Sequence, residues 1–214
     1  MKKSIVVLIS GSGSNFQAIL DHCQQGSING QIVAVISNRD DAFGLKRAEM
    51  AGIPSHFIDH KAFEGRDEFD QSLIDLIDQY QPDLIVLAGF MRILSAKFVR
   101  HYQARLFNIH PSLLPRYKGL NTHQRVLEAG DPEHGCSVHF VTEELDGGPL
   151  VIQAKTDVNT ADTIESLQNR VHALEHQIYP LAVSWFCDDR LQHSPEGVLL
   201  DGKLLPASGF ILEN

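Results

Sequence analysis

Apolar runs alternate with amphipathic segments along most of the chain. Three runs are almost wholly apolar, as is typical of strands buried on both faces of a sheet, and they cover residues 4–9, 32–36 and 83–88. Apolar residues recur three or four positions apart in the intervening segments, which predicts helices at residues 16–23, 42–51 and 66–80. Buried strands that alternate with helices are typical of a parallel sheet. We therefore predict an α/β fold, with a Rossmann-like, predominantly parallel twisted sheet and helices on both faces.

The second half of the chain predicts further strands and helices. We expect strands at residues 106–110, 135–141 and 150–154, a helix at residues 122–129, and a long helix from Thr160 or Asp162 to about Cys187. Pro180 lies inside that helix and predicts a break or bend, because proline removes a backbone hydrogen bond. An Asp-Gly pair at residues 201–202 predicts a C-terminal hairpin over about 197–206.

Length and composition fit a single globular domain. The chain has 214 residues, of which 43% are hydrophobic and 21% charged, and these are ordinary values for a soluble protein. Because we find no repeat or interdomain linker, we expect one domain over residues 1–214. Its phosphate-binding half is expected at about 1–100 and its catalytic half at about 101–190. No apolar run approaches the roughly 20 residues of a membrane span, and the first strand leads into a glycine loop, so we expect a cytoplasmic protein.

Charge and cysteine content argue against several classes of protein. The net charge is −9 and no cluster of Lys or Arg is present, which argues against a nucleic-acid partner. A small phosphorylated ligand remains compatible, because it needs only a few local donors. Cys23, Cys136 and Cys187 are odd in number and widely spaced, so they predict neither a disulfide framework nor a zinc site.

The first predicted strand ends in Ser-Gly-Ser-Gly-Ser-Asn at residues 10–15. Glycines allow a ligand to approach the backbone closely, and the helix that follows offers N–H groups at its positive end. Phe16 stands where a dinucleotide fingerprint has its third glycine, and the Gly-Lys-Ser/Thr ending of a P-loop is missing. We therefore predict simple anion binding at Gly13, Ser14 and Asn15, the alternative being a turn that only caps the helix.

A second loop follows the predicted strand at residues 83–88. Residues 89–94 read Gly-Phe-Met-Arg-Ile-Leu and are unusually apolar, and Ser95 then caps a short helix to about His101. Open α/β sheets bind ligands at the carboxyl ends of their strands. The loop therefore fits the wall of a pocket for a flat, partly apolar ligand, or else a loop that packs into the core.

Residues 106–115, Leu-Phe-Asn-Ile-His-Pro-Ser-Leu-Leu-Pro, begin as a strand and end as a constrained loop. Alternate residues of a strand point to one face, so Asn108 and His110 project together. Pro111 ends the strand, because it has no N–H to donate. An imidazole moves protons near neutral pH and an amide stabilises an oxyanion. The pair therefore predicts a catalytic strand end, the alternative being a polar strand end with a surface histidine.

An acidic loop, Thr-Glu-Glu-Leu-Asp-Gly-Gly-Pro, occupies residues 142–149. Most such loops are exposed acidic turns, but the turn residues around Asp146 allow its carboxylate to reach inward. His110 needs an acidic partner to fix its tautomer, so we predict that Asp146 is that partner. Ser112 lies near His110 and would suggest a Ser–His nucleophile. No nucleophile elbow surrounds it, so we prefer direct transfer without a covalent intermediate.

The predicted long helix carries a possible metal motif. His172, Glu175 and His176 match the HxxEH spacing of inverted zinc peptidases, and the two histidines share one helical face. No distant carboxylate ligand is evident in the sequence, and the helix follows a complete α/β sheet. We therefore predict that no metal binds here.

Four segments together resemble the folate-dependent formyltransferases, and they are residues 11–15, 88–94, 107–115 and 145–149. The resemblance runs over essentially the whole chain, and Asn-Ile-His-Pro-Ser-Leu-Leu-Pro is specific to this superfamily. It implies a formyltransferase fold and transfer of a formyl group from 10-formyltetrahydrofolate, the co-substrate, through a tetrahedral intermediate. The chain is most similar to members that act on the amine of glycinamide ribonucleotide (5-phosphoribosylglycinamide) in de novo purine biosynthesis. We expect a monomer or a weak homodimer.

The resemblance also implies roles for individual residues. Asn108, His110 and Asp146 match the catalytic positions, with Asn108 and protonated His110 as donors to the oxyanion and Asp146 stabilising the imidazolium. The ribonucleotide contacts match Gly13, Ser14 and Asn15 at the phosphate and Glu175 at the ribose. The folate contacts match Arg66, Met91, Arg92, Ile93, Leu94, Asn108, Val141 and Asp146, with Arg66 at the glutamate carboxylate of the folate. Either His110 or a water held by Asp146 shuttles the proton.

The chain departs from the family pattern at Asn121, where members more often have histidine, and at Lys118, where proline is common. A supporting role for that histidine is therefore not carried over to this chain.

Three other functions compete with this hypothesis. Methionyl-tRNA formyltransferases carry a C-terminal RNA-facing domain, whereas only about 25 residues follow the long helix here. Formyltetrahydrofolate hydrolases carry an extra N-terminal domain, whereas this chain starts at the sheet. A non-catalytic nucleotide-binding module would explain the glycine loop but would give Asn108, His110 and Asp146 no reason to converge.

Overall fold

The computed structural model describes residues 1–213. The chain divides into two compact units, the first covering Met1–Asn108 and the second beginning at Ile109. Strand β5 (Leu106–His110) crosses the boundary between the two units.

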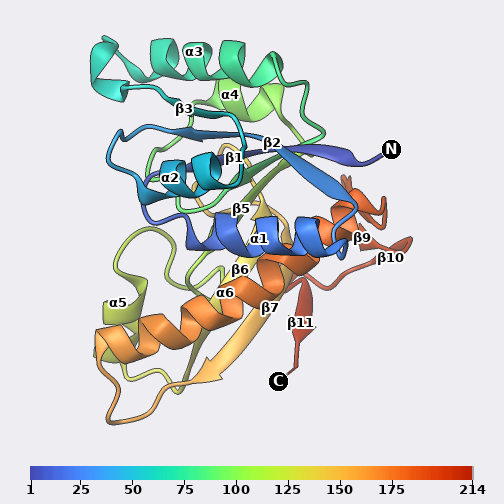
Figure 1. The fold of residues 1–214 in the computed structure, drawn as a ribbon. Helices are drawn as coiled ribbons and strands as arrows, with labels where there is room; N and C mark the ends of the chain where they lie inside the picture. The colour runs from blue at the N-terminus through green and yellow to red at the C-terminus, as the bar shows by residue number, and fades with distance from the viewer. Residues whose placement is uncertain (214) are drawn as a thin grey trace. The chain divides into compact units, whose positions relative to one another are not determined.

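The first unit is built on parallel strands (Figure 1). Besides the start of β5, they are β1 (Lys3–Ile9), β2 (Gly30–Ser37), β3 (Ser55–Phe57) and β4 (Leu84–Leu87). β1 pairs with β2 and with β4, β2 pairs with β3, and β4 pairs with β5, all in parallel. The chain therefore adds β2 and β3 on one side of β1 and then β4 and β5 on its other side. Such a reversal is the topological switch point at which doubly wound sheets bind ligands.

Helices cover both faces of this sheet. They are α1 (Ser14–Gln25), α2 (Phe43–Met50), α3 (Arg66–Asp78) and α4 (Ala96–His101), and a short 3-10 helix, η1, spans His60–Ala62. α1 packs beside α2, and α3 packs beside α4 (Figure 1). Right-handed crossovers place these two pairs on opposite faces, because the chain leaves β1 in opposite directions. The predicted parallel sheet with helices on both faces is confirmed.

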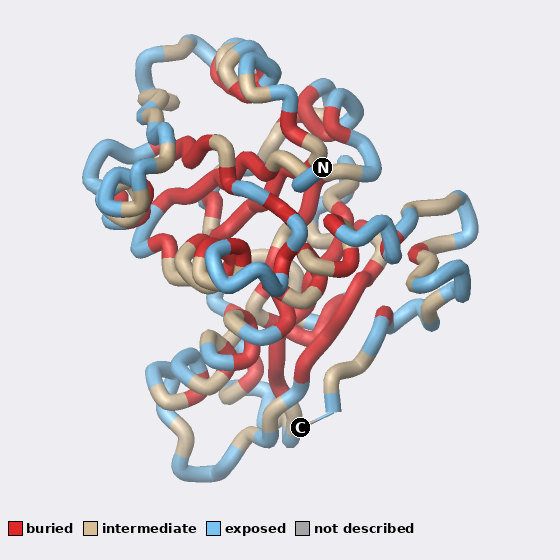
Figure 2. Tube along the Cα trace, turned by 45° about the vertical axis from the view of Figure 1, so that its right-hand side comes forward, coloured by how far each residue is buried: buried red, intermediate tan, exposed pale blue. Residues whose placement is uncertain are grey.

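The core of the first unit follows from the apolar runs of its strands. The last five residues of β1, Ile5 to Ile9, are fully buried, and all four residues of β4 are buried. Figure 2 shows such buried stretches of the trace, bordered by exposed turns. α3 buries Phe69, Leu73 and Ile77 on one face, four residues apart, while acidic residues fill its first exposed turn. The spacing of apolar residues in the sequence therefore matches the faces that the structure buries.

The second unit combines an antiparallel strand pair with a long helix. β6 (Glu133–Phe140) pairs antiparallel with β7 (Leu150–Asp157), and β11 (Phe210–Leu212) runs parallel to β7. α6 (Ile164–Cys187) packs against β6 and β7 and contacts α5 (Thr122–Ala129). A small antiparallel sheet contains β8 (Leu191–Ser194), β9 (Gly197–Leu200) and β10 (Lys203–Leu204). Asp201 and Gly202 form the turn between β9 and β10 with positive φ, as the Asp-Gly pair predicts.

The long helix corrects two sequence predictions. Its N-cap is Thr163, which exchanges hydrogen bonds with Ser166 in a capping box, whereas the sequence predicts Thr160 or Asp162 there. Asp162 instead accepts hydrogen bonds from Ser166 and Arg170. The helix also continues without a break through Pro180 (Figure 1). The residues on either side of the proline are largely buried, so tertiary packing outweighs the lost backbone hydrogen bond.

We predict that Gly44→Ala destabilises the first unit. A Cβ at Gly44, in the first turn of α2, would lie 2.4 Å from Ile9 Cδ1 and 3.2 Å from Gly13 Cα. Such overpacking is expected to lower the free energy of unfolding by about 1–3 kcal/mol, measured by urea denaturation. Gly65→Ala is the control, because its φ of −159° is extended and a Cβ there meets nothing within 4 Å. Equal losses in the two variants would contradict the packing argument.

Candidate active site

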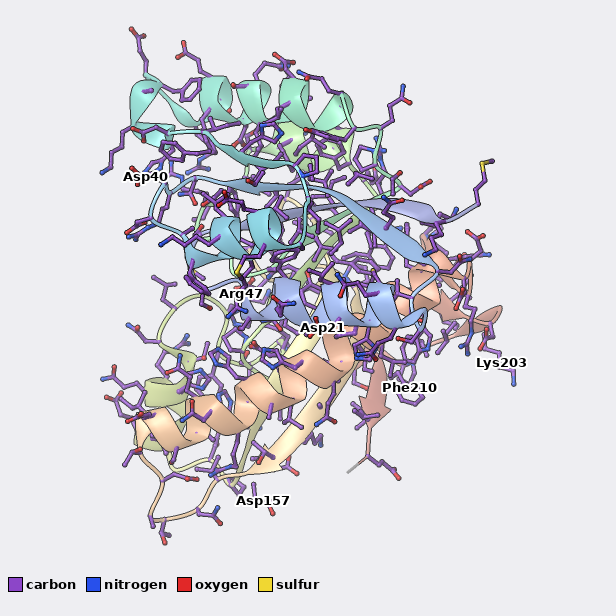
Figure 3. The ribbon with its side chains drawn as sticks, viewed as in Figure 1. Asp21, Asp40, Arg47, Asp157, Lys203 and Phe210 are labelled. Atoms are coloured by element: carbon purple, nitrogen blue, oxygen red, sulfur yellow. The ribbon has the colours of Figure 1, made fainter. Side chains whose placement is uncertain are left out.

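The predicted anion-binding residues lie where β1 gives way to α1. Gly13 is the N-cap of α1 with φ of 70°, a left-handed conformation that glycine adopts without strain. Ser14 begins the helix, and Asn15 is buried in its first turn. Arg47 on α2 donates from Nε to the Ser12 carbonyl at 2.9 Å (Figure 3). The loop is therefore held against α2, with helical N–H groups at its end.

Ser10 joins this loop to the apolar loop that follows β4. The Ser10 N–H donates to the Gly89 carbonyl at 3.1 Å, and the Met91 N–H donates to Ser10 Oγ at 2.7 Å. Ser10 Oγ in turn donates to Asn38 Oδ1 after β2. Within the first unit, one serine thus ties together the carboxyl ends of three neighbouring strands.

The apolar loop exposes large side chains. Met91 is 67% exposed and Ile93 is 56% exposed, whereas Phe90 is buried. Exposed apolar side chains at the switch point suit a pocket wall better than a loop that packs wholly into the core. Arg92 places its guanidinium 5.9 Å from the centre of the Phe69 ring.

Arg66, the predicted contact of the folate glutamate, is the first residue of α3 and is exposed. It lines a surface hollow of about 540 Å³ together with Glu64, Asp67 and Glu68. Arg66 is accessible to a ligand carboxylate, although the three acidic neighbours weaken its attraction for one.

The second unit brings His110 and Asp146 together. His110 Nδ1 lies 3.5 Å from Asp146 Oδ2, and each side chain is only 8% exposed. His110 Nε2 lies 2.9 Å from the Tyr117 carbonyl oxygen, so this nitrogen carries a proton, because a carbonyl only accepts. Both ring nitrogens therefore face acceptors, Nε2 the Tyr117 carbonyl and Nδ1 the Asp146 carboxylate.

Asp146 reaches inward from the loop between β6 and β7. Its φ is 48°, a left-handed conformation uncommon outside glycine, and the Gly119 N–H donates to its Oδ2 at 2.9 Å. Lys118 Nζ lies 2.7 Å from Glu144 Oε1 and joins the same two loops at the surface. The predicted inward turn of this carboxylate is thus observed.

Sequence reasoning missed His139 beside this pair. His139 on β6 is 2% exposed, its Nε2 lies 3.9 Å from Asp146 Oδ1, and its Nδ1 lies 2.9 Å from the Phe140 carbonyl oxygen. Burial lowers the pKa of His139, so the ring favours its neutral form. The alternation of β6 places His139 on the same side as Val141, and that signal was available in the sequence.

Ser112 holds the proline loop through hydrogen bonds that are buried or partly buried. Ser112 Oγ donates to the Arg116 carbonyl at 2.7 Å, and Ser137 Oγ donates to the Ser112 carbonyl at 2.6 Å. Ser137 Oγ also accepts from the Leu114 N–H, and the Leu114–Pro115 peptide bond is cis. These contacts give Ser112 a structural role and argue against a Ser–His nucleophile.

The remaining predicted site residues lie on three elements. Asn108 occupies β5 in register with Leu87 of β4 and is partly buried. Val141 directly follows β6, and Glu175 lies buried on α6 with Oε2 3.9 Å from His172 Nε2.

Residues 1–213 contain no group of three His, Cys, Asp or Glu side chains arranged to hold a metal ion. All three cysteines are buried, and none forms a disulfide within residues 1–213. No helix in this part of the chain has the length and apolar character needed to cross a membrane.

A family model described as formyl transferase matches residues 3–183. The chain therefore belongs to the formyl transferase family, as its motifs predict. It is 56% identical over 207 residues to phosphoribosylglycinamide formyltransferase of Escherichia coli (strain K12), which covers 97% of this chain and 98% of that protein. It is 42% identical over 196 residues to the human trifunctional purine biosynthetic protein adenosine-3, covering 92% of this chain and 19% of that protein. A solved structure of phosphoribosylglycinamide formyltransferase from Coxiella burnetii matches all of this chain and is itself fully covered, with a TM-score of 0.96 and 55% identity.

A second histidine pair lies at the start of α5 and β6. His123 Nδ1 lies 3.0 Å from His134 Nε2, and the rings meet edge to face with their centres 5.0 Å apart. Burial lowers the pKa of both histidines to about 4.

We predict that this pair destabilises the fold in acid. An unfolded histidine takes up a proton below about pH 6.5, whereas the folded pair resists protonation until about pH 4, so stability falls as pH drops through that window. His134 is 1% exposed, and its share of the loss between pH 7 and pH 5 is about 2 kcal/mol. Urea denaturation at the two pH values should show a smaller loss in His134→Gln than in the wild type. Equal losses would contradict this assignment.

Proposed function

We propose that this chain transfers the formyl group of 10-formyltetrahydrofolate to the amine of glycinamide ribonucleotide. The products are formylglycinamide ribonucleotide and tetrahydrofolate, and the reaction belongs to de novo purine biosynthesis. The buried His110–Asp146 pair, in a chain of the formyl transferase family, is the observation that carries this proposal. The relatives named phosphoribosylglycinamide formyltransferase, similar over almost the whole chain, support the choice of acceptor.

The chemistry uses donors aimed at developing charge. The neutral amine attacks the formyl carbon, and the formyl oxygen becomes an oxyanion in the tetrahedral intermediate. The Asn108 amide and protonated His110 donate to that oxygen, with His110 Nε2 turning from the Tyr117 carbonyl to the oxyanion while Nδ1 stays beside Asp146. Such donors contribute roughly 3–4 kcal/mol each in well-studied enzymes. Asp146 stabilises the imidazolium at 3.5 Å. The attacking amine loses a proton through His110 or through a water held by Asp146, and the folate nitrogen that carried the formyl group gains one. The carbon–nitrogen bond to the folate then breaks as the oxyanion becomes the carbonyl of the new formamide, and tetrahydrofolate is released.

The substrate contacts are assigned residue by residue from the family resemblance. Gly13, Ser14 and Asn15 bind the phosphate of the ribonucleotide, where backbone N–H groups at a helix start favour an anion. Glu175 binds its ribose. The folate contacts are Arg66, Met91, Arg92, Ile93, Leu94, Asn108, Val141 and Asp146. The co-substrate is specifically 10-formyltetrahydrofolate, and catalysis uses no metal.

The chain acts as one formyltransferase domain over residues 1–214, as a monomer or a weak homodimer in the cytoplasm. The net charge of −9 supports small-molecule partners over nucleic acid.

We predict that His110→Ala and Asp146→Asn each lower kcat by about 10²–10³-fold while the fold survives. A formyl-transfer assay with purified variants measures the rate, and thermal unfolding monitors the fold. His101→Ala is the matched control, because His101 Nε2 also lies beside an aspartate, 2.9 Å from Asp78 Oδ2, but at the surface. Wild-type rates in either site variant would exclude the pair from catalysis.

We also predict that Asn15→Ala raises the KM for the ribonucleotide by about 5- to 20-fold. The KM for the folate should rise by less than about twofold. The expected cause is loss of a hydrogen bond to a charged phosphate. Gln24→Ala, at an exposed position of the same helix, should change neither KM. If the folate KM rises instead, the phosphate binds elsewhere.

A further inference from the structure

A buried carboxylate holds the far end of the apolar loop that follows β4. Asp70 lies on α3 and is 1% exposed. Its Oδ2 accepts a hydrogen bond from the Ser95 N–H at 2.5 Å, and the Ser95 side chain also bonds to the carboxyl group. Ser95 is the N-cap of α4, so the contact fixes the point at which the loop becomes a helix.

Burial of the Asp70 carboxyl group at this position is energetically unfavourable. Desolvation raises its pKa, and within residues 1–213 its Oδ1 is buried without a hydrogen-bond partner. The neighbouring buried positions of α3 are apolar, and an apolar residue would be buried there at lower cost. The packing of α3 therefore does not explain the carboxylate, whereas its bonds to Ser95 do.

The loop is held at its other end as well. The Met91 N–H donates to Ser10 Oγ at 2.7 Å, and Ser95 is bound to Asp70 four residues later. Between these two anchors, Ile93 is 56% exposed and makes no contribution to the core. The loop therefore keeps its shape through side-chain acceptors at both ends and not through burial of its own side chains.

We propose that Asp70 is a positioning residue for the folate site, because it locks the segment Met91–Leu94 to α3 through Ser95. This inference rests on the proposed function, in which that segment lines the folate pocket. α3 also carries Arg66, one helical turn before Asp70 and on the same side. Asp70 thereby keeps the pocket wall in register with the side chain that receives the folate carboxylate.

The signature of this role is a selective change in folate binding. Loss of the anchor frees the loop before folate binds, so binding must then order it again. The residues assigned to chemistry and to the ribonucleotide phosphate lie on other segments. The KM for 10-formyltetrahydrofolate should therefore rise, while kcat and the KM for the ribonucleotide stay nearly constant.

Asp70→Ala, Asp70→Asn and Asp83→Ala test the inference. Asp83 is the matched control, because its Oδ2 accepts from the N–H and the hydroxyl of Ser4 at 2.8 and 3.1 Å, the same kind of contact at the opposite ends of the strands. We expect Asp70→Ala to raise the folate KM by about tenfold, with kcat and the ribonucleotide KM within about twofold of the wild type. Asp70→Asn should restore most of the affinity, because its amide oxygen still accepts, and Asp83→Ala should leave both KM values unchanged.

Two results would overturn the inference. One is a folate KM in Asp70→Ala that equals the value in Asp83→Ala. The other is a loss spread equally over both KM values and kcat, which would indicate general damage to the fold. Absence of any formyl transfer by the wild-type protein would instead refute the proposed function, so the two failures are distinguishable.

A second pair of variants applies where Asp70→Ala fails to fold. Ser95→Pro removes the N–H donor, and the φ of −71° at Ser95 already suits a proline ring. Ser95→Ala loses the hydroxyl but keeps the N–H, so the pair isolates the backbone donor. We expect the folate KM of Ser95→Pro to be about 5- to 10-fold higher than that of Ser95→Ala. Equal folate KM values would overturn the inference.

Discussion

The contact between His110 and Asp146 is the point at which the loops of the second unit meet. An imidazole and a carboxylate, each with a side chain 8% exposed, are unfavourable to bury unless their donors and acceptors are satisfied. The Tyr117 carbonyl and the Gly119 N–H satisfy them, and both lie in one loop. That loop follows the proline segment, which Ser112 and its buried partners hold in place. Rigid support is what a proton-transfer pair needs, because small displacements weaken its hydrogen bonds.

In the first unit, buried side chains hold loops whose own side chains stay largely exposed. Ser10 ties the glycine loop to the apolar loop, and Asp70 ties the apolar loop to α3. Both side chains are buried acceptors of backbone N–H groups, so the loops need little burial of their own. Apolar residues such as Met91 and Ile93 then remain exposed, as the proposed folate contact requires.

The sequence predicts most of the fold, because buried strands and helix faces require apolar residues at regular spacings. The fully buried strands β1 and β4 appear as apolar runs, and α3 shows its core face at four-residue spacing. The sequence also predicts Asp146 as a site residue, because the imidazole of His110 needs an acidic partner. Contacts that depend on tertiary structure left weaker signals: Asp70 looks like one more polar residue of an amphipathic helix, and Pro180 looks like a helix breaker until the packing around it is known.

Acceptor-dependent formyl transfer is the most direct test of this account. Purified wild-type protein is incubated with 10-formyltetrahydrofolate, with and without glycinamide ribonucleotide, and the formation of tetrahydrofolate is followed. We expect tetrahydrofolate to form only when the ribonucleotide is present. Its amount should equal that of formylglycinamide ribonucleotide. Tetrahydrofolate formed at the same rate without the acceptor would contradict it and would indicate a hydrolase.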